Sequence, residues 1–293
     1  MKKLLLVLNP CSGTRKASKS LAEIVSVFNR AGYMVDTYIT AEQGDATRVV
    51  AERGADTDLI VCCGGDGTYN ETVSGMMANS ITTPIGYIPA GSTNDFANSL
   101  KLPTNCVKAA QSIVDGELFS YDVGKFADRY FTYVASFGAF TKTSYATPQN
   151  VKNALGHVAY VLEGMQEITQ LRSLPVRLEL DGQVIEDNFL FGAICNSTSL
   201  GGLLTLDPKQ VDMSDGLFEV FLVRTPKSLA EFHECLWSIQ RHQYNCRCIT
   251  FCSAASIKIT ANADMAWTLD GERAPGAEQI QIQNLHNAIR LRK

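Results

Sequence analysis

Three glycines surround a single aspartate in the stretch GGDGTYNE, where Asp66 follows Gly64 and Gly65 and precedes Gly67. The stretch comes directly after the apolar run DLIVCC and leads into a helical pattern. Glycine can adopt positive φ and carries no side chain that would keep a ligand from the backbone. Backbone N–H groups at the start of a helix attract anions. The stretch therefore predicts a phosphate-binding loop, although the same turn could be a plain connection between a strand and a helix.

Two further segments at the ends of predicted strands carry similar residues. NPCSG covers residues 9–13, and AGSTNDF covers residues 90–96. Because open α/β sheets bind ligands at the carboxyl ends of their strands, three such loops favour a phosphate site over three unrelated turns. The first segment lacks the G-K-[ST] of a P-loop and the G-x-G-x-x-G of a dinucleotide-binding loop.

The loops must be positioned by the elements around them. Short apolar strands alternate with amphipathic helices from residue 1 to about residue 126, which predicts an α/β domain with a parallel sheet and flanking helices. The predicted strands are 3–9, 34–40, 58–63 and 84–90, and the predicted helices are 20–33, 46–55, 70–79 and one that begins near residue 92.

The second half of the chain has a different residue pattern. Residues 127–293 contain runs rich in β-branched and aromatic residues, separated by turn signals, and they predict a mainly β domain. These runs include 129–137, 175–187, 189–195, 217–223, 256–261 and 279–284, with a hairpin turn at Asp181 and Gly182. Helical patterns at 155–171 and 228–242 interrupt the strands.

Composition bounds the classes of protein that fit. The 293 residues are 45% hydrophobic and 19% charged, as expected of a folded chain of about two domains. A formal net charge of −4 gives no overall attraction to nucleic acid, so we expect no nucleic-acid partner. No apolar run approaches the roughly 18 residues that span a bilayer, and the apolar start lacks a cleavage site. We therefore expect a cytoplasmic protein without a transmembrane segment.

The cysteines do not indicate a disulfide framework. There are nine of them, an odd number, and their spacing is scattered. His242, Cys246, Cys248 and Cys252 could bind zinc, but their spacing matches no common zinc finger. A strand with its flanks is the preferred interpretation of that segment.

Four motifs occur in one order along the chain: NPCSG, GGDGTYNE, PAGSTNDF and, at residues 269–272, LDGE. Together they resemble the diacylglycerol kinase catalytic family of bacterial lipid kinases, and the resemblance covers essentially the whole chain. GGDGT alone is shared with NAD kinases, so the series is more specific than any one motif. The resemblance implies the two-domain NAD kinase/diacylglycerol kinase-like fold, with an α/β nucleotide-binding domain at 1–126 and a β-sandwich lipid-substrate domain at 127–293. ATP would bind in the cleft between them, and the last strand could return to the first domain.

The resemblance also implies nucleotide-binding roles for particular positions. They are Asn9, Pro10, Cys11, Ser12, Gly13, Thr40, Gly65, Asp66, Gly67, Thr68, Tyr69, Asn70, Glu71, Ser92, Asn94 and Asp95. Ser92 stands where the family often has threonine, and serine keeps the hydroxyl.

A magnesium ion is the second expected cofactor besides ATP. Phosphoryl transfer requires neutralisation of charge, and no P-loop lysine is present to supply it. Asp66, Asp95 and Asp122 match the acidic positions around the nucleotide's magnesium in the family. Taken alone, Asp122 is more simply a turn aspartate.

A second magnesium site is implied in the β-rich half. VDMSDGLFEV resembles the family's D-x-x-D-G-x-L-like site, except that the leucine follows Gly216 directly. Asp212, Asp215 and the carbonyl of Leu217 are the candidate ligands, and the ion's role would be structural. An ordinary Asp-rich turn is the alternative.

Glu272 in LDGE matches the family's proposed general base, which takes the proton from the attacking lipid hydroxyl. From sequence alone, a carboxylate in a glycine-flanked hairpin is usually just solvated. Asp66 is the alternative base.

The sequence thus predicts an ATP-dependent lipid kinase, with diacylglycerol as the favoured acceptor and phosphatidic acid as its product. A sphingoid base or another lipid alcohol stays open as the acceptor. An NAD kinase shares GGDGT but is not expected to carry the NPxSG opening. A catalytically silent nucleotide-binding regulator would tolerate loss of the acidic residues, and these are all present.

A lipid acceptor implies an apolar slot and transient contact with the inner face of the membrane. Phe137, Phe140 and Tyr160 are candidates for the slot, although a core position is the default for aromatics. Arg172, Arg224, Lys227, Arg241 and Arg247 could form a membrane-facing patch, or they could be scattered over a solvated surface. A homodimer through an exposed sheet edge in the second half also stays open.

Overall fold

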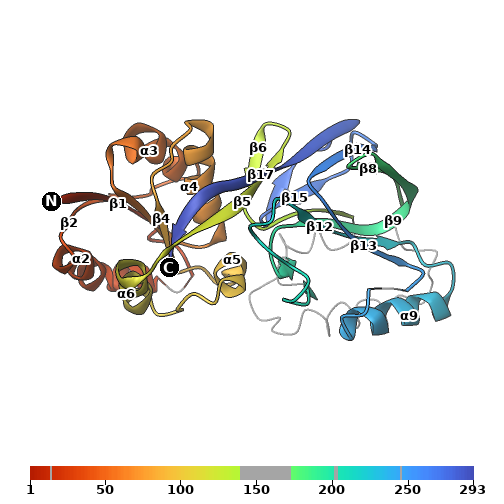
Figure 1. Cartoon of the computed structure of the whole chain (residues 1–293), viewed down its shortest axis with the longest axis horizontal. Coiled ribbons are helices and arrows are strands. Elements are labelled where there is room, and N and C mark those ends of the chain that lie inside the picture. Colours follow the sequence, from red (N-terminus) through yellow and green to blue (C-terminus); the bar gives the residue numbers. More distant parts are fainter. Residues whose placement is uncertain (14, 139–172, 201–203, 245) are drawn as a thin grey trace. The chain divides into compact units, whose positions relative to one another are not determined.

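A computed structural model describes residues 1–13, 15–138, 173–200, 204–244 and 246–293. The predicted helix at 155–171 lies outside the described residues, as do Phe140, Tyr160 and Arg172. The chain divides into two compact units. The first unit comprises Met1–Val123 and His286–Lys293, and the second comprises Gly124–Leu285 (Figure 1).

The first unit is built on a parallel sheet with the strand order β4-β3-β1-β2. Its strands are β1 (Lys2–Leu8), β2 (Tyr33–Ile39), β3 (Leu59–Gly64) and β4 (Ile85–Pro89), and the end of β17 (Gln279–Arg292) pairs with β4 in parallel. Its helices are α1 (Lys16–Lys19), α2 (Leu21–Arg30), α3 (Asp45–Arg53), α4 (Asp66–Ala78), α5 (Asp95–Ser99) and α6 (Cys106–Asp115), with a 3₁₀ turn η1 (Gly54–Asp56). The predicted α/β architecture with a parallel sheet is confirmed.

Helices cover both faces of this sheet, with α3 and α4 on one face and α2 and α6 on the other (Figure 1). The α2 helix buries Ile24 and Phe28, which lie one turn apart, against the apolar residues of β1 and β3. Gly32 follows this helix with φ +86, the left-handed conformation that ends many helices. The central strands are buried on both faces, as a parallel sheet between two helical layers requires.

The second unit is mainly β. Its strands are β6 (Arg129–Phe131), β7 (Val134–Gly138), β8 (Leu174–Leu180), β9 (Gln183–Cys195), β10 (Ser199–Leu200), β11 (Leu204–Thr205), β12 (Phe218–Arg224), β13 (Ile249–Ala254), β14 (Ser256–Ala261), β15 (Trp267–Leu269) and β16 (Glu272–Ala274). It also contains the helix α9 (Leu229–Gln240). The chain passes between the units in β5 (Leu118–Phe126) and in β17.

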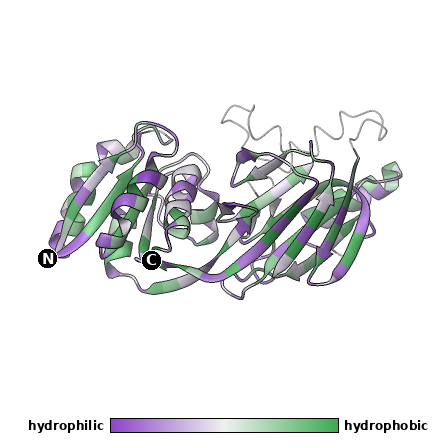
Figure 2. Cartoon of the chain, turned by 90° about the horizontal axis from the view of Figure 1, so that it is seen from above, coloured by the Kyte–Doolittle hydropathy of each residue, from purple (hydrophilic) through white to green (hydrophobic). Residues whose placement is uncertain are grey.

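The long strand β9 organises the second unit because it changes partners along its length. Its first half pairs with β8, and its second half pairs with β7 and β12. One core gathers the inward side chains of β7, β12 and β15 together with those of β8, β14 and β17. Figure 2 shows the resulting alternation of apolar and polar residues along these strands. The predicted β-rich second half is confirmed.

Two strand predictions need correction. The run at 129–137 is two strands, β6 and β7, because the N–H groups of Thr132, Tyr133 and Val134 are bound by the side chain of Asp270 instead of continuing one ladder. The runs at 175–187 and 189–195 are joined, because β9 continues without a break from the hairpin turn to Cys195. No helix within the described ranges is long and apolar enough to cross a membrane.

Candidate functional site

Three loops of the first unit meet at the carboxyl ends of β1, β3 and β4. The side-chain amide of Asn9 donates a hydrogen bond of 2.9 Å to Oγ1 of Thr68, in the first turn of α4. Gly13 has φ +50 and lies directly against the β4 loop, since a Cβ on Gly13 would be 2.5 Å from the carbonyl oxygen of Ala90. The three glycine-containing loops predicted from the sequence are therefore neighbours.

Gly65 and Gly91 bring the loops after β3 and β4 into backbone contact. A Cβ on Gly91 would lie 2.6 Å from the Cα of Gly65, which is closer than real Cβ atoms approach. A Cβ on Gly64 would lie 2.6 Å from the Cβ of Thr68. None of the three glycines around Asp66 has positive φ, so this loop does not use the left-handed conformation that glycine allows. Side chains are disfavoured at both positions because Thr68 packs against Gly64, and a Cβ on Gly65 would lie 3.2 Å from the Cα of Gly91.

The carboxylate of Asp66 binds the start of α5. Its Oδ2 accepts a hydrogen bond from the N–H of Asp95 (3.0 Å), and its Oδ1 accepts one from the N–H of Phe96 (3.3 Å). A carboxylate stabilises a helix N-terminus by satisfying N–H groups that have no partner within the helix. Asp95 is itself buried. Two of the aspartates predicted to lie near the nucleotide are thus adjacent.

Asn94 shapes the loop between β4 and α5. Its backbone is left-handed, with φ 54 and ψ 51, a conformation that asparagine adopts more readily than most residues. Its side chain closes the turn on Gly91, accepting from the Gly91 N–H (2.8 Å) and donating to the Gly91 carbonyl (2.9 Å). Ser92 lies within this turn, next to the glycine that contacts Gly65.

The loop after β1 is held by its own polar groups. Oδ1 of Asn9 accepts a hydrogen bond from the N–H of Cys11 (2.9 Å), and the carbonyl of Pro10 accepts one from Oγ of Ser18 (3.3 Å). Ser12 is buried and Cys11 is exposed. These hydrogen bonds fix the backbone conformation of the loop beside the start of α4.

Thr40 and Glu71 flank the same edge of the sheet. The N–H of Thr40 donates to the carbonyl of Leu8 (2.9 Å), which places Thr40 beside the end of β1. One carboxylate oxygen of Glu71 accepts a hydrogen bond from the N–H of Gly44 (3.0 Å). Asn70, at the preceding position of α4, accepts a hydrogen bond of 3.4 Å from Ser74 through its Oδ1.

Tyr69 differs from its neighbours in α4 because its side chain belongs to the core. It is fully buried, and its ring stacks on Phe96 and packs against Tyr87, with ring centres 4.8 Å and 4.5 Å apart. Its backbone N–H already donates to the carbonyl of Gly65. The sequence placed Tyr69 with the nucleotide-binding residues, but this side chain is committed to packing.

Asp122 is 1% exposed and lies in the middle of β5. Its Oδ1 pairs with Nδ1 of His286 at 3.0 Å and accepts a hydrogen bond of 2.7 Å from the N–H of Asn287. Both partners come from β17, and Asn287 has φ +53. The carboxylate therefore links β5 to the returning last strand within the first unit. His286 carried no signal in the sequence, because a lone histidine indicates no particular partner.

Glu272 and Asp270 lie in one hairpin of the second unit. Asp270 and Gly271 form the two-residue turn between β15 and β16, with φ 49 and φ 85. Asp270 is buried and accepts hydrogen bonds from the N–H groups of Thr132 (2.6 Å), Tyr133 (3.0 Å) and Val134 (3.0 Å), and from Oγ1 of Thr132 (2.8 Å).

Burial raises the pKa of the Asp270 carboxyl above its ordinary value, and those hydrogen bonds oppose the rise. Glu272, two residues later, is partly exposed, and its Oε2 lies 4.0 Å from a guanidinium nitrogen of Arg129. The hairpin thus contains one buried carboxylate bound to the backbone and one that is partly exposed. Only Glu272 was predicted from the sequence as a functional residue.

The predicted site at Asp212, Asp215 and Leu217 is a compact turn. Oδ1 of Asp212 accepts from the N–H of Ser214 (3.0 Å), and Oδ1 of Asp215 accepts from the N–H of Leu217 (2.9 Å). The carbonyl of Leu217 accepts from Nδ2 of Asn284 (3.0 Å), whose own buried Oδ1 lacks a hydrogen-bond partner within the described part of the chain.

These groups fit a magnesium ion in donor type, because carboxylate, carbonyl and amide oxygens are the ligands that this ion prefers. The candidate ligands are the exposed carboxylates of Asp212 and Asp215, the Leu217 carbonyl and the buried Oδ1 of Asn284, whose Nδ2 binds that carbonyl. Among the described residues, no three His, Cys, Asp or Glu side chains are grouped so as to hold a metal. This applies to the aspartates of the first unit and to the cysteines around α9. All nine cysteines are free thiols.

Comparison with known proteins agrees with both halves of the chain. Residues 3–126 match the diacylglycerol kinase catalytic domain, and residues 135–291 match the YegS C-terminal NAD kinase beta sandwich-like domain. The chain is 33% identical over 294 residues to a diacylglycerol kinase of Bacillus subtilis (strain 168), which covers 99% of this chain and 96% of that protein. It is 33% identical over 270 residues to a diacylglycerol kinase of Staphylococcus haemolyticus (strain JCSC1435), covering 91% and 81%.

Solved structures agree with the fold. A crystal structure of a diacylglycerol kinase from Bacillus anthracis aligns with a TM-score of 0.74 at 25% identity, over 99% of this chain and 96% of that one. A second Bacillus anthracis structure aligns with a TM-score of 0.82 at 26% identity and the same coverage. The matches in sequence, the fold of both units and the meeting of the three motif loops show that the chain belongs to the diacylglycerol kinase catalytic family, and is a lipid kinase.

Proposed function

We propose that this kinase transfers the γ-phosphoryl group of ATP to the free hydroxyl of diacylglycerol and so produces phosphatidic acid. The observation that supports this best is the convergence of the Asn9, Gly65 and Gly91 loops at the start of α4, a 13-residue helix. Glycine backbones packed this closely allow a polyphosphate to approach main-chain N–H groups. Relatives with the same whole-chain match are diacylglycerol kinases, which suggests the acceptor.

In this proposal, the first unit binds the nucleotide. Residues of the loops at 9–13, 65–71 and 92–95, together with Thr40, hold the phosphates and exclude water from them. The side chain of Tyr69 contributes only through the core that supports α4. Magnesium, when bound, supplies positive charge that offsets the charge of the transferring group. Asp66, Asp95 and Asp122 are the carboxylates that would hold it through water.

In the same proposal, Glu272 accepts the proton of the lipid hydroxyl. A general base must be able to reach that proton and must be held in one orientation. The Glu272 carboxylate is partly exposed, and its hairpin is anchored by the four hydrogen bonds to Asp270. Asp66 is the weaker candidate, because both of its oxygens already accept hydrogen bonds from the start of α5.

We assign a structural magnesium to Asp212, Asp215 and the Leu217 carbonyl. Each carboxylate uses its Oδ1 to shape the turn, so the ion would be held mainly by the remaining oxygens and by water. The reaction itself needs no group from this turn.

The test is transfer of labelled γ-phosphate from ATP to a short-chain, dispersed diacylglycerol in the presence of magnesium. The Asp66→Ala variant serves as the blank, and circular dichroism checks that it is folded. Label in phosphatidic acid that is absent from the blank supports the proposal. A wild-type protein that hydrolyses or binds ATP but leaves this lipid unlabelled would overturn it.

A further inference from the structure

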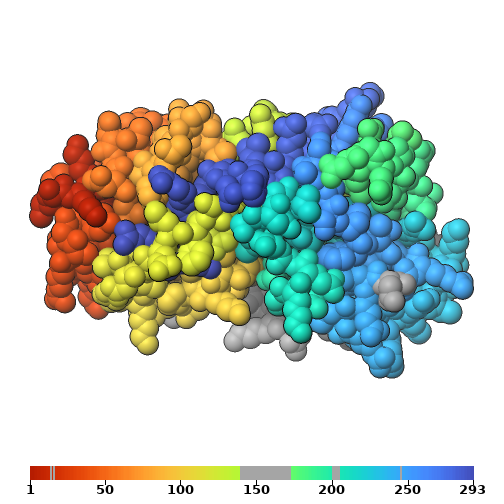
Figure 3. Space-filling model, in the orientation of Figure 1, coloured from red at the N-terminus to blue at the C-terminus, as the bar shows by residue number. Residues whose placement is uncertain are grey.

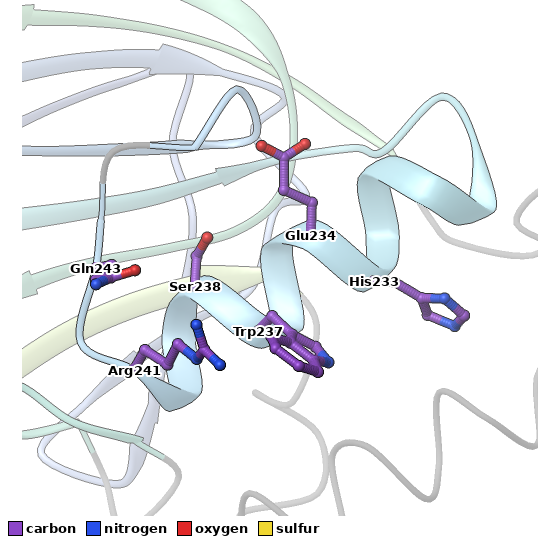
Figure 4. A pocket seen from close by; sticks show the side chains of 6 residues that line it. All are labelled: His233, Glu234, Trp237, Ser238, Arg241 and Gln243. Atoms are coloured by element: carbon purple, nitrogen blue, oxygen red, sulfur yellow. The ribbon is translucent and has the colours of Figure 1, made fainter.

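The α9 helix carries a line of side chains on its outer surface. Leu229, His233, Trp237 and Arg241 follow one another at intervals of four residues, from the first residue of the helix to the residue that caps its end. Residues four apart share one face of a helix. Figure 4 shows His233, Trp237 and Arg241 projecting from the same side of α9. We refer to these four residues as the α9 stripe.

The α9 stripe includes two unusually exposed apolar side chains. Leu229 is 61% exposed and Trp237 is 60% exposed. The helix packs on its unit through Phe232 and Cys235, which are buried on another face. The stripe is therefore not part of the core. The helix forms part of the molecular surface in the space-filling view (Figure 3).

Hydrogen bonds cap the start of α9, so the α9 stripe lies on a well-defined helix. Oγ of Ser228 accepts a hydrogen bond from the N–H of Glu231 (3.2 Å), and the Glu231 carboxylate accepts one from the N–H of Lys227 (2.8 Å). This reciprocal arrangement satisfies backbone donors at the helix start. The thiol of Cys248, in the segment before β13, lies 3.9 Å from the Glu231 carboxylate.

Trp237 and Arg241 form the centre of the surface. The guanidinium of Arg241 lies 4.5 Å from the centre of the Trp237 ring, a cation–π contact. Both residues border a shallow groove of about 410 Å³ that His233, Glu234, Ser238 and Gln243 also line (Figure 4). Tryptophan, with an apolar body and one N–H donor, is favoured where hydrocarbon meets water.

The charge around the stripe differs in sign from that of the whole chain. Lys227, Arg241 and Arg247 are exposed, and Glu234 is the exposed acidic residue among the described positions of 227–247. The Glu231 carboxylate is only partly exposed and is engaged in the helix cap. With His neutral, Lys227, Arg241 and Arg247 against Glu231 and Glu234 leave one positive charge over this segment, whereas the complete chain has a formal net charge of −4. Such a surface complements an anionic layer.

We propose that the α9 stripe docks the enzyme onto an anionic lipid bilayer. Leu229 and Trp237 enter the interface, while Arg241 contacts lipid phosphates. This inference rests on the proposed function, because diacylglycerol resides in a bilayer and the kinase must reach it there. A helix that lies flat with an apolar and basic face is a recognised way to bind such an interface.

The chain is well suited to a fluorescence test, because it contains two tryptophans. Trp267 is fully buried in the core, whereas Trp237 is largely exposed. Vesicles of phosphatidylcholine mixed with phosphatidylglycerol should shift the emission to shorter wavelength, and lipids brominated near the headgroup should quench it. The Trp237→Phe variant should lose both changes, and the Trp267→Phe variant should keep them. An emission spectrum of wild-type protein that does not respond to these vesicles overturns the proposal.

Vesicle flotation with variants tests the same surface without fluorescence. Trp237→Ala should weaken binding about tenfold or more through lost apolar burial. Arg241→Gln should weaken it about fivefold, and only for vesicles that contain phosphatidylglycerol. The matched controls are Met34→Ala, an exposed apolar residue of β2, and Arg177→Gln, an exposed arginine of β8, and both should bind as wild type.

The outcomes separate this inference from the proposed function. Activity toward a dispersed short-chain diacylglycerol should be unchanged in all four variants, while activity toward diacylglycerol in vesicles should fall only in Trp237→Ala and Arg241→Gln. If the Trp237→Ala variant binds vesicles as tightly as the wild type does, the proposed docking surface is overturned, even if the enzyme phosphorylates diacylglycerol. A change of oligomeric state in that variant, with unchanged vesicle binding, would assign the stripe to a contact between subunits and also overturn the proposal.

Discussion

Two acidic residues of one hairpin, Asp270 and Glu272, differ in what surrounds them. Asp270 is 4% exposed and accepts four hydrogen bonds, three of them from consecutive backbone N–H groups. Glu272 is partly exposed and lies beside Arg129. At the scale of the residue, the first carboxylate holds the fold, and the second is the one that we propose as the general base. The two can therefore be separated by experiment.

Glu272→Gln should lower the turnover number by about 10²- to 10⁴-fold, because an amide cannot accept the proton of the lipid hydroxyl. Stability should not change, since the side chain is partly solvated. Steady-state kinetics with dispersed diacylglycerol, beside a thermal melt, measures both quantities. Turnover close to that of wild type would remove Glu272 from the role of base and promote Asp66.

Asp270→Asn should lower the free energy of unfolding by about 2–4 kcal/mol, because the amide presents an N–H₂ group where the carboxylate accepted N–H donors. The matched control is Asp181→Asn in the β8–β9 hairpin. Asp181 also precedes a turn glycine and accepts two backbone hydrogen bonds of 2.9 Å, but at an exposed site. Urea denaturation of both variants should show the larger loss at Asp270. Equal losses would mean that burial does not amplify these hydrogen bonds.

At the scale of the element, the phosphate-binding edge depends on contacts between loops. Gly91 follows β4 and touches Gly65, which follows β3. Gly91→Ala should therefore push the two loops apart and raise the KM for ATP by about tenfold or more, since displacements of about 1 Å can cost 10²-fold in enzyme activity.

The matched control for Gly91→Ala is Gly32→Ala. That position is strained by its φ of +86, but no atom lies within 4 Å of the added Cβ. It should lose stability while the KM for ATP stays unchanged. An unchanged KM for ATP in Gly91→Ala, measured at saturating lipid, would show that the contact between Gly65 and Gly91 does not position the ATP-binding loops.

Most elements of the first unit were predictable, because apolar periodicity is a local property of the sequence. The four strands are within one residue or so of their predicted bounds. Helix α4 begins at Asp66 rather than at residue 70, because its first turn consists of the glycine stretch that was interpreted as a loop. Helix α6 was not predicted, although Asn105 caps it by accepting from the N–H of Lys108. Two of its four buried residues are alanines, which give a weak apolar signal.

The candidate site was predictable only where the residues form local motifs. The motifs located the three loops, but not the contacts between them. Asp270 binds Thr132 across 138 positions, and Asp122 pairs with His286 across 164 positions, and no local pattern reports such pairing. The composition of the loop at Gly65 likewise did not show that Gly91 approaches it from another loop.

At the scale of the whole molecule, magnesium bound at the proposed Asp212–Asp215 site should stabilise the folded chain. An ion bound only by the folded protein at about 100 times its Kd adds ~2.7 kcal/mol of stability. Removal of magnesium by EDTA should therefore lower the melting temperature of the second unit in wild type. Asp215→Asn should melt at the lower temperature with or without EDTA.

The control for the magnesium experiment is Asp128→Asn, an exposed aspartate in the turn between β5 and β6. It should respond to EDTA as wild type does. A wild-type melting curve that is the same with magnesium and with EDTA would leave the Asp212 turn as an ordinary Asp-rich turn.

A single competition experiment decides whether the whole molecule phosphorylates diacylglycerol, as we claim. Labelled ATP and magnesium are supplied with diacylglycerol, sphingosine, ceramide, monoacylglycerol and NAD together, and the labelled products are separated and identified. We predict that phosphatidic acid carries nearly all of the label and that the Asp66→Ala blank carries none. Label found mainly in another lipid, or in NAD, would contradict the claim.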